Sequence, residues 1–212
     1  SIPEGARVID AKGKTIVPGY VDAHAHVANF GGGVIPQQNW AYYANLAFGI
    51  TTAHDPSATS EFVFSQAELV HSGAMVGPRM FSTGTILYGA DGDFKAVISS
   101  LEDARNTIAR MKAVGAFSVK SYNQPRREQR QQVVEAARRE GMQVVAEGGS
   151  LFGMDMTIAA DGNSTLEHNI PLGVFYDDVL SFFPQTQTNY TPTLVVSYGG
   201  LAGDPYWRQA TD

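Results

Sequence analysis

Two histidines lie two residues apart at the end of an apolar stretch, in the segment GYVDAHAHV at positions 19–27. In a β-strand, side chains at i and i+2 point to the same side, so His24 and His26 are expected to face one direction. Two imidazoles on one buried face each need a partner, and one divalent cation bound at about 2.0–2.1 Å would satisfy both. A lone histidine is more simply explained as a hydrogen-bonded core residue, so the pair indicates a metal site only if further donors accompany it.

Three further side chains of metal-binding type close later strand-like segments. Lys120 ends AFSVK, Glu147 ends VVAE and His168 ends STLEH. In α/β folds ligands gather at the carboxyl ends of parallel strands, so these donors are expected at one rim. The chain has no cysteine, which excludes disulfides, thiolate metal sites and a cysteine nucleophile. A metal would therefore depend on histidine, carboxylate or modified lysine ligands.

The elements that must position these donors alternate between strand-like and helix-like segments. For example, Ser99 and Glu102 have the spacing of a capping box, and the apolar residues that follow predict a helix that ends before Gly115. About seven strands and six helices in alternation are typical of a parallel sheet with helical crossovers. A doubly wound sheet and a (β/α)8 barrel both fit this order. No G-x-G-x-x-G follows the first strand, which disfavours a dinucleotide-binding fold.

Composition limits the classes of partner. The chain has 212 residues, of which 43% are hydrophobic, and a net charge of −6. No run approaches the roughly 18 apolar residues of a membrane span, and no basic patch favours nucleic acid. A small-molecule substrate is therefore the expected partner. Any export signal is expected to lie outside this chain, and the sequence does not distinguish cytoplasm from periplasm.

The order and context of these residues resemble the amidohydrolase superfamily. VIDAKGKTIVPGYVDAHAHV is similar to the start of that family's catalytic barrel, whose H-x-H binds the more buried metal, and GITTAHD is similar to its second strand. Lys120 falls where many members carry a lysine carboxylated by CO2 that bridges two metals, and His168 matches the histidine ligand of strand 6. The closest branch resembles imidazolonepropionases and prolidases, and EGGSLF is similar to members that have a TolB-like propeller.

This resemblance implies an α/β fold of the (β/α)8 TIM-barrel type and a metal-dependent hydrolase. The implied reaction is cleavage of a C–N bond, in a cyclic amide or a peptide-like substrate, by a water molecule that a metal makes nucleophilic near neutral pH. One or two divalent cations are implied, with zinc expected first and manganese or iron as alternatives. The implied metal ligands are His24, His26, Lys120, Glu147 and His168.

The resemblance also implies roles for individual side chains. Lys120, as a carbamate, and Glu147 are the expected catalytic residues. His54 and Tyr88 follow the second and third strands, and both are expected to contact substrate. For His54, a plain role in a loop remains the alternative.

The sequence departs from the family pattern at two places. Glu147 stands where strand 5 normally provides a histidine, and its charge would make the metal cage less positive. Lys120 and Glu147 could instead form an ion pair, with no carbamate and no second metal. The aspartate of strand 8 has no counterpart, because Asp204 follows Val196 too closely for a parallel crossover of about ten to twelve residues.

The expected organisation is a remnant of a small β-domain over residues 1–18 and a catalytic barrel over residues 19–212 that lacks its eighth strand. Open strand edges of such a barrel are expected to pair with another chain, so self-association is expected. The 212-residue chain alone is expected to be inactive. The alternative to an enzyme is a catalytically impaired metal-binding or scaffold domain.

Overall fold

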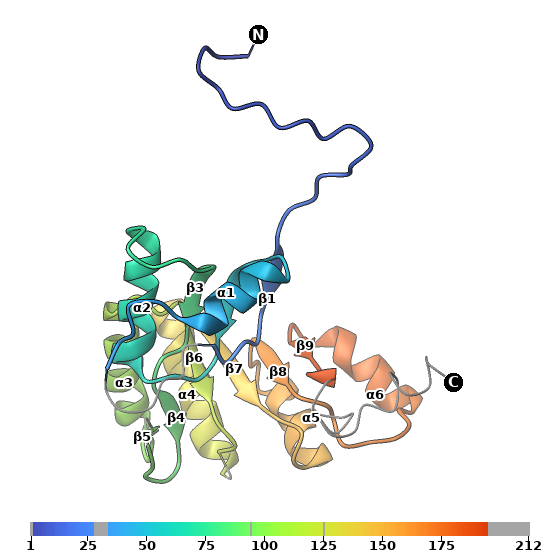
Figure 1. Ribbon diagram of the computed structural model, residues 1–212. Helices are drawn as coiled ribbons and strands as arrows, with labels where there is room; N and C mark the ends of the chain where they lie inside the picture. Colours follow the sequence, from blue (N-terminus) through green and yellow to red (C-terminus); the bar gives the residue numbers. More distant parts are fainter. Residues whose placement is uncertain (1, 28–33, 94, 125, 195–212) are drawn as a thin grey trace.

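A computed structural model describes residues 2–27, 34–93, 95–124 and 126–194. In this part of the chain short parallel strands alternate with helices (Figure 1). The predicted α/β class and the predicted parallel pairing are both confirmed. No helix in the described ranges is long and apolar enough to cross a membrane.

The strands belong to two sheets. The first has the order β1-β2-β3, and the second has the order β5-β4-β6-β7-β8-β9. The strands of the first sheet are β1 (Tyr20–Asp22), β2 (Ile50–Asp55) and β3 (Arg79–Ser82). Those of the second are β4 (Ile86–Tyr88), β5 (Lys95–Val97), β6 (Ser118–Ser121), β7 (Gln143–Glu147), β8 (Thr165–Glu167) and β9 (Asn189–Thr191).

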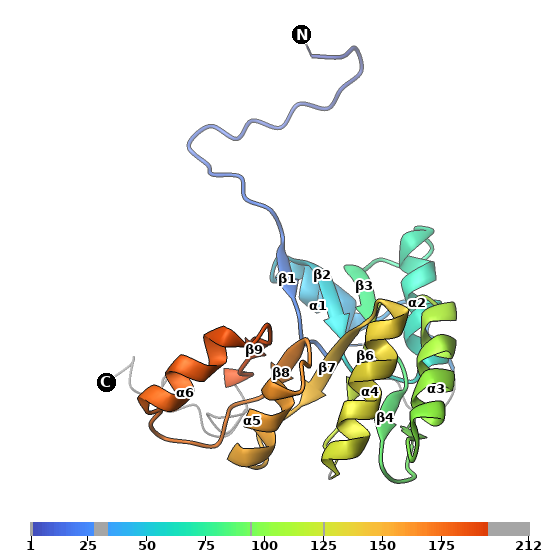
Figure 2. The same cartoon turned by 180° about the vertical axis from the view of Figure 1, so that it is seen from behind.

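Helices connect most of these strands. They are α1 (Trp40–Ala47), α2 (Ser60–His71), α3 (Leu101–Ala113), α4 (Arg127–Glu140), α5 (Phe152–Ala160) and α6 (Asp177–Phe182), which the 3₁₀ helix η1 (Phe183–Gln185) follows. The helices α3 and α4 lie side by side on the outside of the sheet (Figure 2). Their apolar faces cover β4, β6 and β7 in a buried cluster that includes Leu87, Ile108, Val119, Val133 and Val144.

The start of α3 differs by one residue from the predicted capping box. Ser100, not Ser99, is the N-cap, and its hydroxyl accepts a hydrogen bond from the Asp103 N–H at 3.1 Å. Asp103 in turn accepts from the Ser99 N–H at 3.1 Å, so Asp103 takes the reciprocal role that the spacing had given to Glu102. Both pairs have the same spacing.

The two sheets face a common apolar cavity of about 460 Å³. Side chains of both sheets line it, among them Val21, Phe81, Phe117, Val145 and Thr191. A hydrogen bond of 2.9 Å between His54 of β2 and Ser118 of β6 also joins the two sheets. Residues 2–18 extend away from both sheets and form no strand, so their assignment to a small β-domain stays a prediction (Figure 1).

Candidate metal-binding active site

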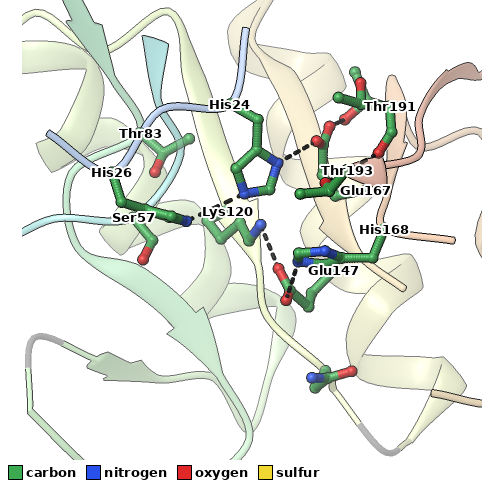
Figure 3. A network of polar contacts seen from close by, with 12 residues as sticks. His24, His26, Ser57, Thr83, Lys120, Glu147, Glu167, His168, Thr191 and Thr193 are labelled. Carbon is green, nitrogen blue, oxygen red and sulfur yellow. Dashed lines mark hydrogen bonds and ion pairs between the residues drawn. The ribbon is translucent and has the colours of Figure 1, made fainter. Parts of the chain in front are cut away.

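The carboxyl ends of four strands bring the five predicted donors together (Figure 3). Lys120 lies in β6, Glu147 ends β7, His168 directly follows β8, and the histidine pair follows β1. The side chains of His26, Lys120, Glu147 and His168 line one pocket of about 370 Å³, together with Ser57 and Tyr122. His24 lies beside this pocket, with its ring centroid 5.2 Å from that of His168.

The histidine pair lies just beyond the end of its strand. β1 ends at Asp22, whose carboxylate accepts a hydrogen bond from the His24 N–H at 3.0 Å, so the prediction that both histidines lie within the strand is wrong. Pairing with β2 nevertheless continues, because the Ala25 N–H donates to the His54 carbonyl at 3.0 Å. Ala25 is buried, so His24 and His26 share the opposite side as the i, i+2 spacing predicted.

His168 reaches the pocket through an unusual backbone conformation. Its φ is +70°, in the left-handed region, and its N–H donates to the Thr191 carbonyl of β9 at 2.9 Å. Gly149 makes room beside it, because a Cβ at this glycine would lie 2.9 Å from the Cβ of His168. Left-handed backbone in a residue other than glycine is uncommon and clusters at functional sites.

Lys120, Glu147 and His168 form a chain of ionic contacts. Lys120 Nζ lies 2.5 Å from Glu147 Oε2, and His168 Nε2 lies 2.7 Å from Glu147 Oε1. Burial by itself would raise the pKa of Glu147, but the hydrogen bond from His168 and the Lys120 ammonium lower that pKa to about 2. Glu147 is therefore an ionised carboxylate at neutral pH, suited to bind a cation and unsuited to donate a proton.

Lys120 and His168 both retain unused hydrogen-bonding capacity. Within the described ranges, Lys120 Nζ is buried and makes no hydrogen bond beyond its ion pair with Glu147, and His168 Nδ1 has no partner. A lysine ammonium carries three donors. The unused donors lie in a pocket that a further group on Nζ would enter.

The two histidines of the pair each contact a carboxylate through Nδ1. His24 Nδ1 lies 2.5 Å from Glu167 Oε2, and His26 Nδ1 lies 3.2 Å from Asp55 Oδ1. The two Nε2 atoms face each other at 3.1 Å. If both Nδ1 atoms donate to their carboxylates, both Nε2 lone pairs point at the same place, which is favourable only when a cation or an extra proton lies between them. The residues at this position therefore fit a divalent metal.

As the side chains stand, the donors are divided between two groups. Among the described residues, no three histidine or carboxylate side chains converge on one point in the arrangement of a metal centre. The His24–His26 pair forms one group, and Lys120, Glu147 and His168 form the other, linked to each other by ion pairs. A metal bound by Lys120, Glu147 and His168 would replace the ionic contacts among these three side chains.

The two predicted substrate contacts lie away from the pocket lining. His54 lines the apolar cavity between the sheets, where its nitrogens contact the Ala23 carbonyl at 3.2 Å and Ser118 Oγ at 2.9 Å. Burial lowers the pKa of His54, so its ring is neutral near pH 7. The Tyr88 ring packs at 5.8 Å against that of Tyr122, which lines the pocket.

Sequence reasoning did not identify Glu167 and Ser57. Side chains alternate between the two faces of a strand, and this pattern could have identified Glu167. Thr165 and Glu167 occupy positions i and i+2, and both line the interior cavity. Ser57 lies in an irregular loop, where no periodicity marks the side chains that reach the pocket.

Comparison with known proteins gives a likeness in structure alone. No protein-family model matches the chain, and no curated protein matches it. Among solved structures, a putative prolidase from Bifidobacterium longum matches with a TM-score of 0.70 and 22% identity, over 92% of this chain and 51% of that chain. A Xaa-Pro dipeptidase with bound methionine in its active site matches with a TM-score of 0.65 and 21% identity, over 84% and 53%.

A third structure, phenylurea hydrolase B, has a TM-score of 0.66 and 20% identity, over 90% of this chain and 56% of that chain. The chain thus spans only about half the length of the structures it matches. At 20–22% identity, the likeness to these structures is one of fold alone. The chain therefore has the fold of the amidohydrolases and prolidases that it matches.

Proposed function

We propose that this chain forms the metal-binding part of an amidohydrolase-type hydrolase that cleaves a C–N bond. The observation that carries the proposal is the meeting of five donor side chains from four strand ends around one pocket, with two imidazole Nε2 atoms 3.1 Å apart. Side chains that lie 143 residues apart contact each other there. A fold stabilised by packing alone has no need for this arrangement.

The proposed architecture is a (β/α)8 TIM barrel, to which the described residues contribute seven strands. Two observations support it: both sheets face one apolar cavity, and the donors lie at the carboxyl ends of parallel strands, as they do in barrel enzymes. In this proposal β6, β7, β8 and β9 are barrel strands four to seven. An eighth strand of the barrel would lie between β9 and β1, at the ends of the two sheets.

In the proposed site His24 and His26 hold one divalent cation. His168 and Glu147 hold a second, and Lys120, carboxylated on Nζ, lies between the two. Three imidazoles and a carboxylate suit zinc, with manganese or iron as alternatives.

Formal charges are consistent with both a one-metal and a two-metal state. Asp55, Glu147 and Glu167 together outweigh the Lys120 ammonium by two negative charges when the histidines are neutral. One divalent cation would balance this excess. Conversion of Lys120 to a carbamate replaces a positive charge with a negative one, and a second divalent cation would balance that change. Carboxylation and the second metal are therefore expected to stabilise each other.

A divalent cation in the site would supply Lewis acidity, which makes a water molecule nucleophilic near neutral pH and polarises the carbonyl of the scissile bond. The side chains around the site have two roles in this chemistry. Before a metal binds, Glu147 is already ionised, because the hydrogen bond from His168 and the Lys120 ammonium lower its pKa to about 2. The hydroxyl groups of Ser57 and Tyr122 on the pocket wall provide hydrogen bonds to a polar substrate.

The proposed substrate is a cyclic amide or a peptide-like molecule. The names of the matched structures support this class, since they include a Xaa-Pro dipeptidase, a phenylurea hydrolase and a bottromycin amidohydrolase. A pocket of about 370 Å³ has the size of a small-molecule site.

One observation favours a second candidate, a metal-binding domain without turnover. The contact of 2.5 Å between Lys120 and Glu147 is an ion pair, which needs neither a carbamate nor a second metal. In that case only the His24–His26 position would bind a cation.

The test measures metal content and turnover. Protein purified without chelator is compared with the His24→Ala/His26→Ala double variant and with His71→Ala, an exposed histidine at the end of α2 that serves as the control. We expect the double variant to lose at least one bound zinc per chain by elemental analysis, and the control to retain it. Hydrolysis of a panel of cyclic amides and dipeptides is then assayed with the complete natural protein, because this chain alone is expected to be inactive. Metal binding without turnover would support the second candidate, and equal metal in all three proteins would contradict both.

A further inference from the structure

We infer that Glu167 and Asp55 are positioning residues that fix the tautomers of His24 and His26 and so preorganise the first metal position. This inference rests on the proposed function, because it concerns residues that would act on a cation through their histidine neighbours. It adds two residues to the site and predicts which of them contributes more to metal affinity.

Glu167 is held rigidly for this role. It is buried, and Thr165 Oγ1 donates to its Oε1 at 2.5 Å. The other oxygen, Oε2, is thereby left to accept from His24 Nδ1 at 2.5 Å (Figure 3). Both side chains of this pair are almost completely excluded from solvent, so no water replaces the contact. The His24 ring therefore has one stable arrangement, with its proton on Nδ1 and its Nε2 lone pair toward His26.

Asp55 fixes the ring of His26 in a similar way, and it lies in the first sheet, whereas Glu167 lies in the second. Asp55 ends β2 and is fully buried, and its Oδ1 accepts from the Ser57 N–H at 3.1 Å and from His26 Nδ1 at 3.2 Å. The His26 side chain is 44% exposed, so water can compete for its Nδ1. The contact is also longer than that of His24. Asp55 is therefore expected to fix its histidine less strongly than Glu167.

Together the two carboxylates determine what lies between the rings. A histidine that donates Nδ1–H to a carboxylate has a more basic Nε2 and a fixed ring orientation. With both rings held in this way, the two Nε2 atoms lie 3.1 Å apart with both lone pairs directed between the rings, where a cation would be favourable. Affinity for the cation is therefore expected to depend on both carboxylates.

The inference is tested first on the unaltered protein. Long-range ¹H–¹⁵N correlation spectra of metal-free protein report which ring nitrogens carry protons, with signals assigned by single His→Gln substitutions. We expect Nδ1 to be protonated in both His24 and His26. An unprotonated Nδ1 in either ring overturns the inference, and this measurement requires no variant at the carboxylates to fold.

The second test measures affinity for Zn²⁺ by competition with a chromophoric chelator. Glu167→Gln keeps the shape of the side chain and removes its charge, and is expected to weaken Zn²⁺ binding about 10- to 100-fold. Asp55→Asn is expected to weaken it less. Glu135→Gln, an exposed carboxylate of α4 that pairs with Arg138 and Arg139, is the control and should bind as the wild type does.

The outcomes separate the inference from the proposed function. If the wild type binds Zn²⁺ and both variants bind it equally well, the positioning role is wrong and the proposed function stands. If the wild type binds no Zn²⁺, the proposed function fails, and the inference that rests on it fails as well. The inference is supported in full if Glu167→Gln lowers the affinity for Zn²⁺ more than Asp55→Asn does.

Discussion

A buried ammonium group needs compensation for its lost hydration, and Lys120 receives it from Glu147. The Lys120 side chain is 1% exposed and its partner carboxylate 13% exposed, so water contributes little to the pair. An isolated charge in such a place would be costly, and a buried ion pair seldom stabilises a fold by itself. The pair is therefore expected to serve a function rather than to stabilise the fold.

At the residue scale we predict that Lys120 reacts with CO2 when metal is present. The ammonium first loses a proton to solvent. The neutral amine then adds to the carbon of CO2, so that an N–C bond forms and one C=O π bond breaks. A second proton leaves, and an anion replaces a cation next to the metal positions. In metal-loaded protein incubated with ¹³C-bicarbonate, we expect one carbamate signal by ¹³C NMR that is absent from Lys120→Gln. Activity should fall when CO2 is depleted and return with bicarbonate. An unmodified Lys120 in fully metallated, active protein would contradict the prediction.

At the scale of elements, the connection between β7 and α5 determines where Glu147 and Glu167 lie. The Gly148 N–H donates to the Glu167 carbonyl at 3.1 Å, which ties the end of β7 to the end of β8. A Cβ at Gly148 would lie 2.8 Å from Asp155 Oδ1 and 3.1 Å from the Glu167 carbonyl oxygen. The two strands approach this closely only because position 148 has no side chain.

We predict that Gly148→Ala destabilises the protein by about 1–3 kcal/mol, the usual effect of overpacking a well-packed region. The matched control is Gly153→Ala in α5, where an added Cβ meets no atom within 4 Å. Alanine there should stabilise the helix by about 0.5–1 kcal/mol. Urea unfolding of the two variants measures both effects. Equal stability of the two variants would show that the β7–β8 junction adapts freely.

Asp155 in the first turn of α5 makes stability depend on pH. It is fully buried, and burial raises its pKa to about 6, although the hydrogen bond from the Gly149 N–H acts in the opposite direction. Because the pKa is higher in the folded state than in the unfolded state, this carboxyl group stabilises the fold at pH values below about 4. That contribution is lost as the pH rises toward about 6.

We therefore predict that Asp155→Asn removes part of the pH dependence of stability between about pH 4 and pH 6. In the wild type, the Gly149 N–H donates to Asp155 Oδ1 at 3.1 Å and to Oδ2 at 3.2 Å. Asparagine keeps one oxygen that can accept this hydrogen bond. The free energy of unfolding is measured by urea denaturation at several pH values for both proteins. Parallel curves for the wild type and the variant would show that Asp155 titrates normally.

At the scale of the whole molecule, the described part of each sheet ends in a strand with one free edge. β1 ends the first sheet and β9 ends the second, and the cavity of about 460 Å³ between the sheets has a mostly apolar surface. Tyr20 and Val21 of β1 are about two-thirds exposed, at 66% and 67%. Unpaired backbone beside exposed apolar side chains favours pairing with another strand.

We predict that the 212-residue chain self-associates through these edges. Sedimentation velocity should show a sedimentation coefficient that rises with protein concentration. Tyr20→Lys places a charge at the edge and should reduce association, because a lysine there opposes edge-to-edge pairing. Val174→Lys is the control, since Val174 is similarly exposed, at 64%, and lies outside both sheets. A monomer at all concentrations would refute the prediction.

The sequence alone determined the alternation of strands and helices and the five donor residues. Both are local properties: hydrophobic periodicity fixes each element, and a donor directly after a strand must lie at that strand's carboxyl end. The helix α3 and the positions of Lys120, Glu147 and His168 were predictable for this reason. The exact end of β1 was not, because the Asp22 turn competes with strand pairing over only two residues.

Only the tertiary structure decided which groups contact these donors. Glu167 reaches His24 across 143 residues, and Asp55 reaches His26 from a different strand. Such contacts depend on how the two sheets face each other, and this depends on side-chain contacts between them, such as the Phe81–Phe117 ring contact and the His54–Ser118 hydrogen bond. No local pattern records that packing, since the same alternating strands can assemble in several orders. The residue types thus come from the sequence, and the tautomers and charges that would prepare them for a metal come from the fold.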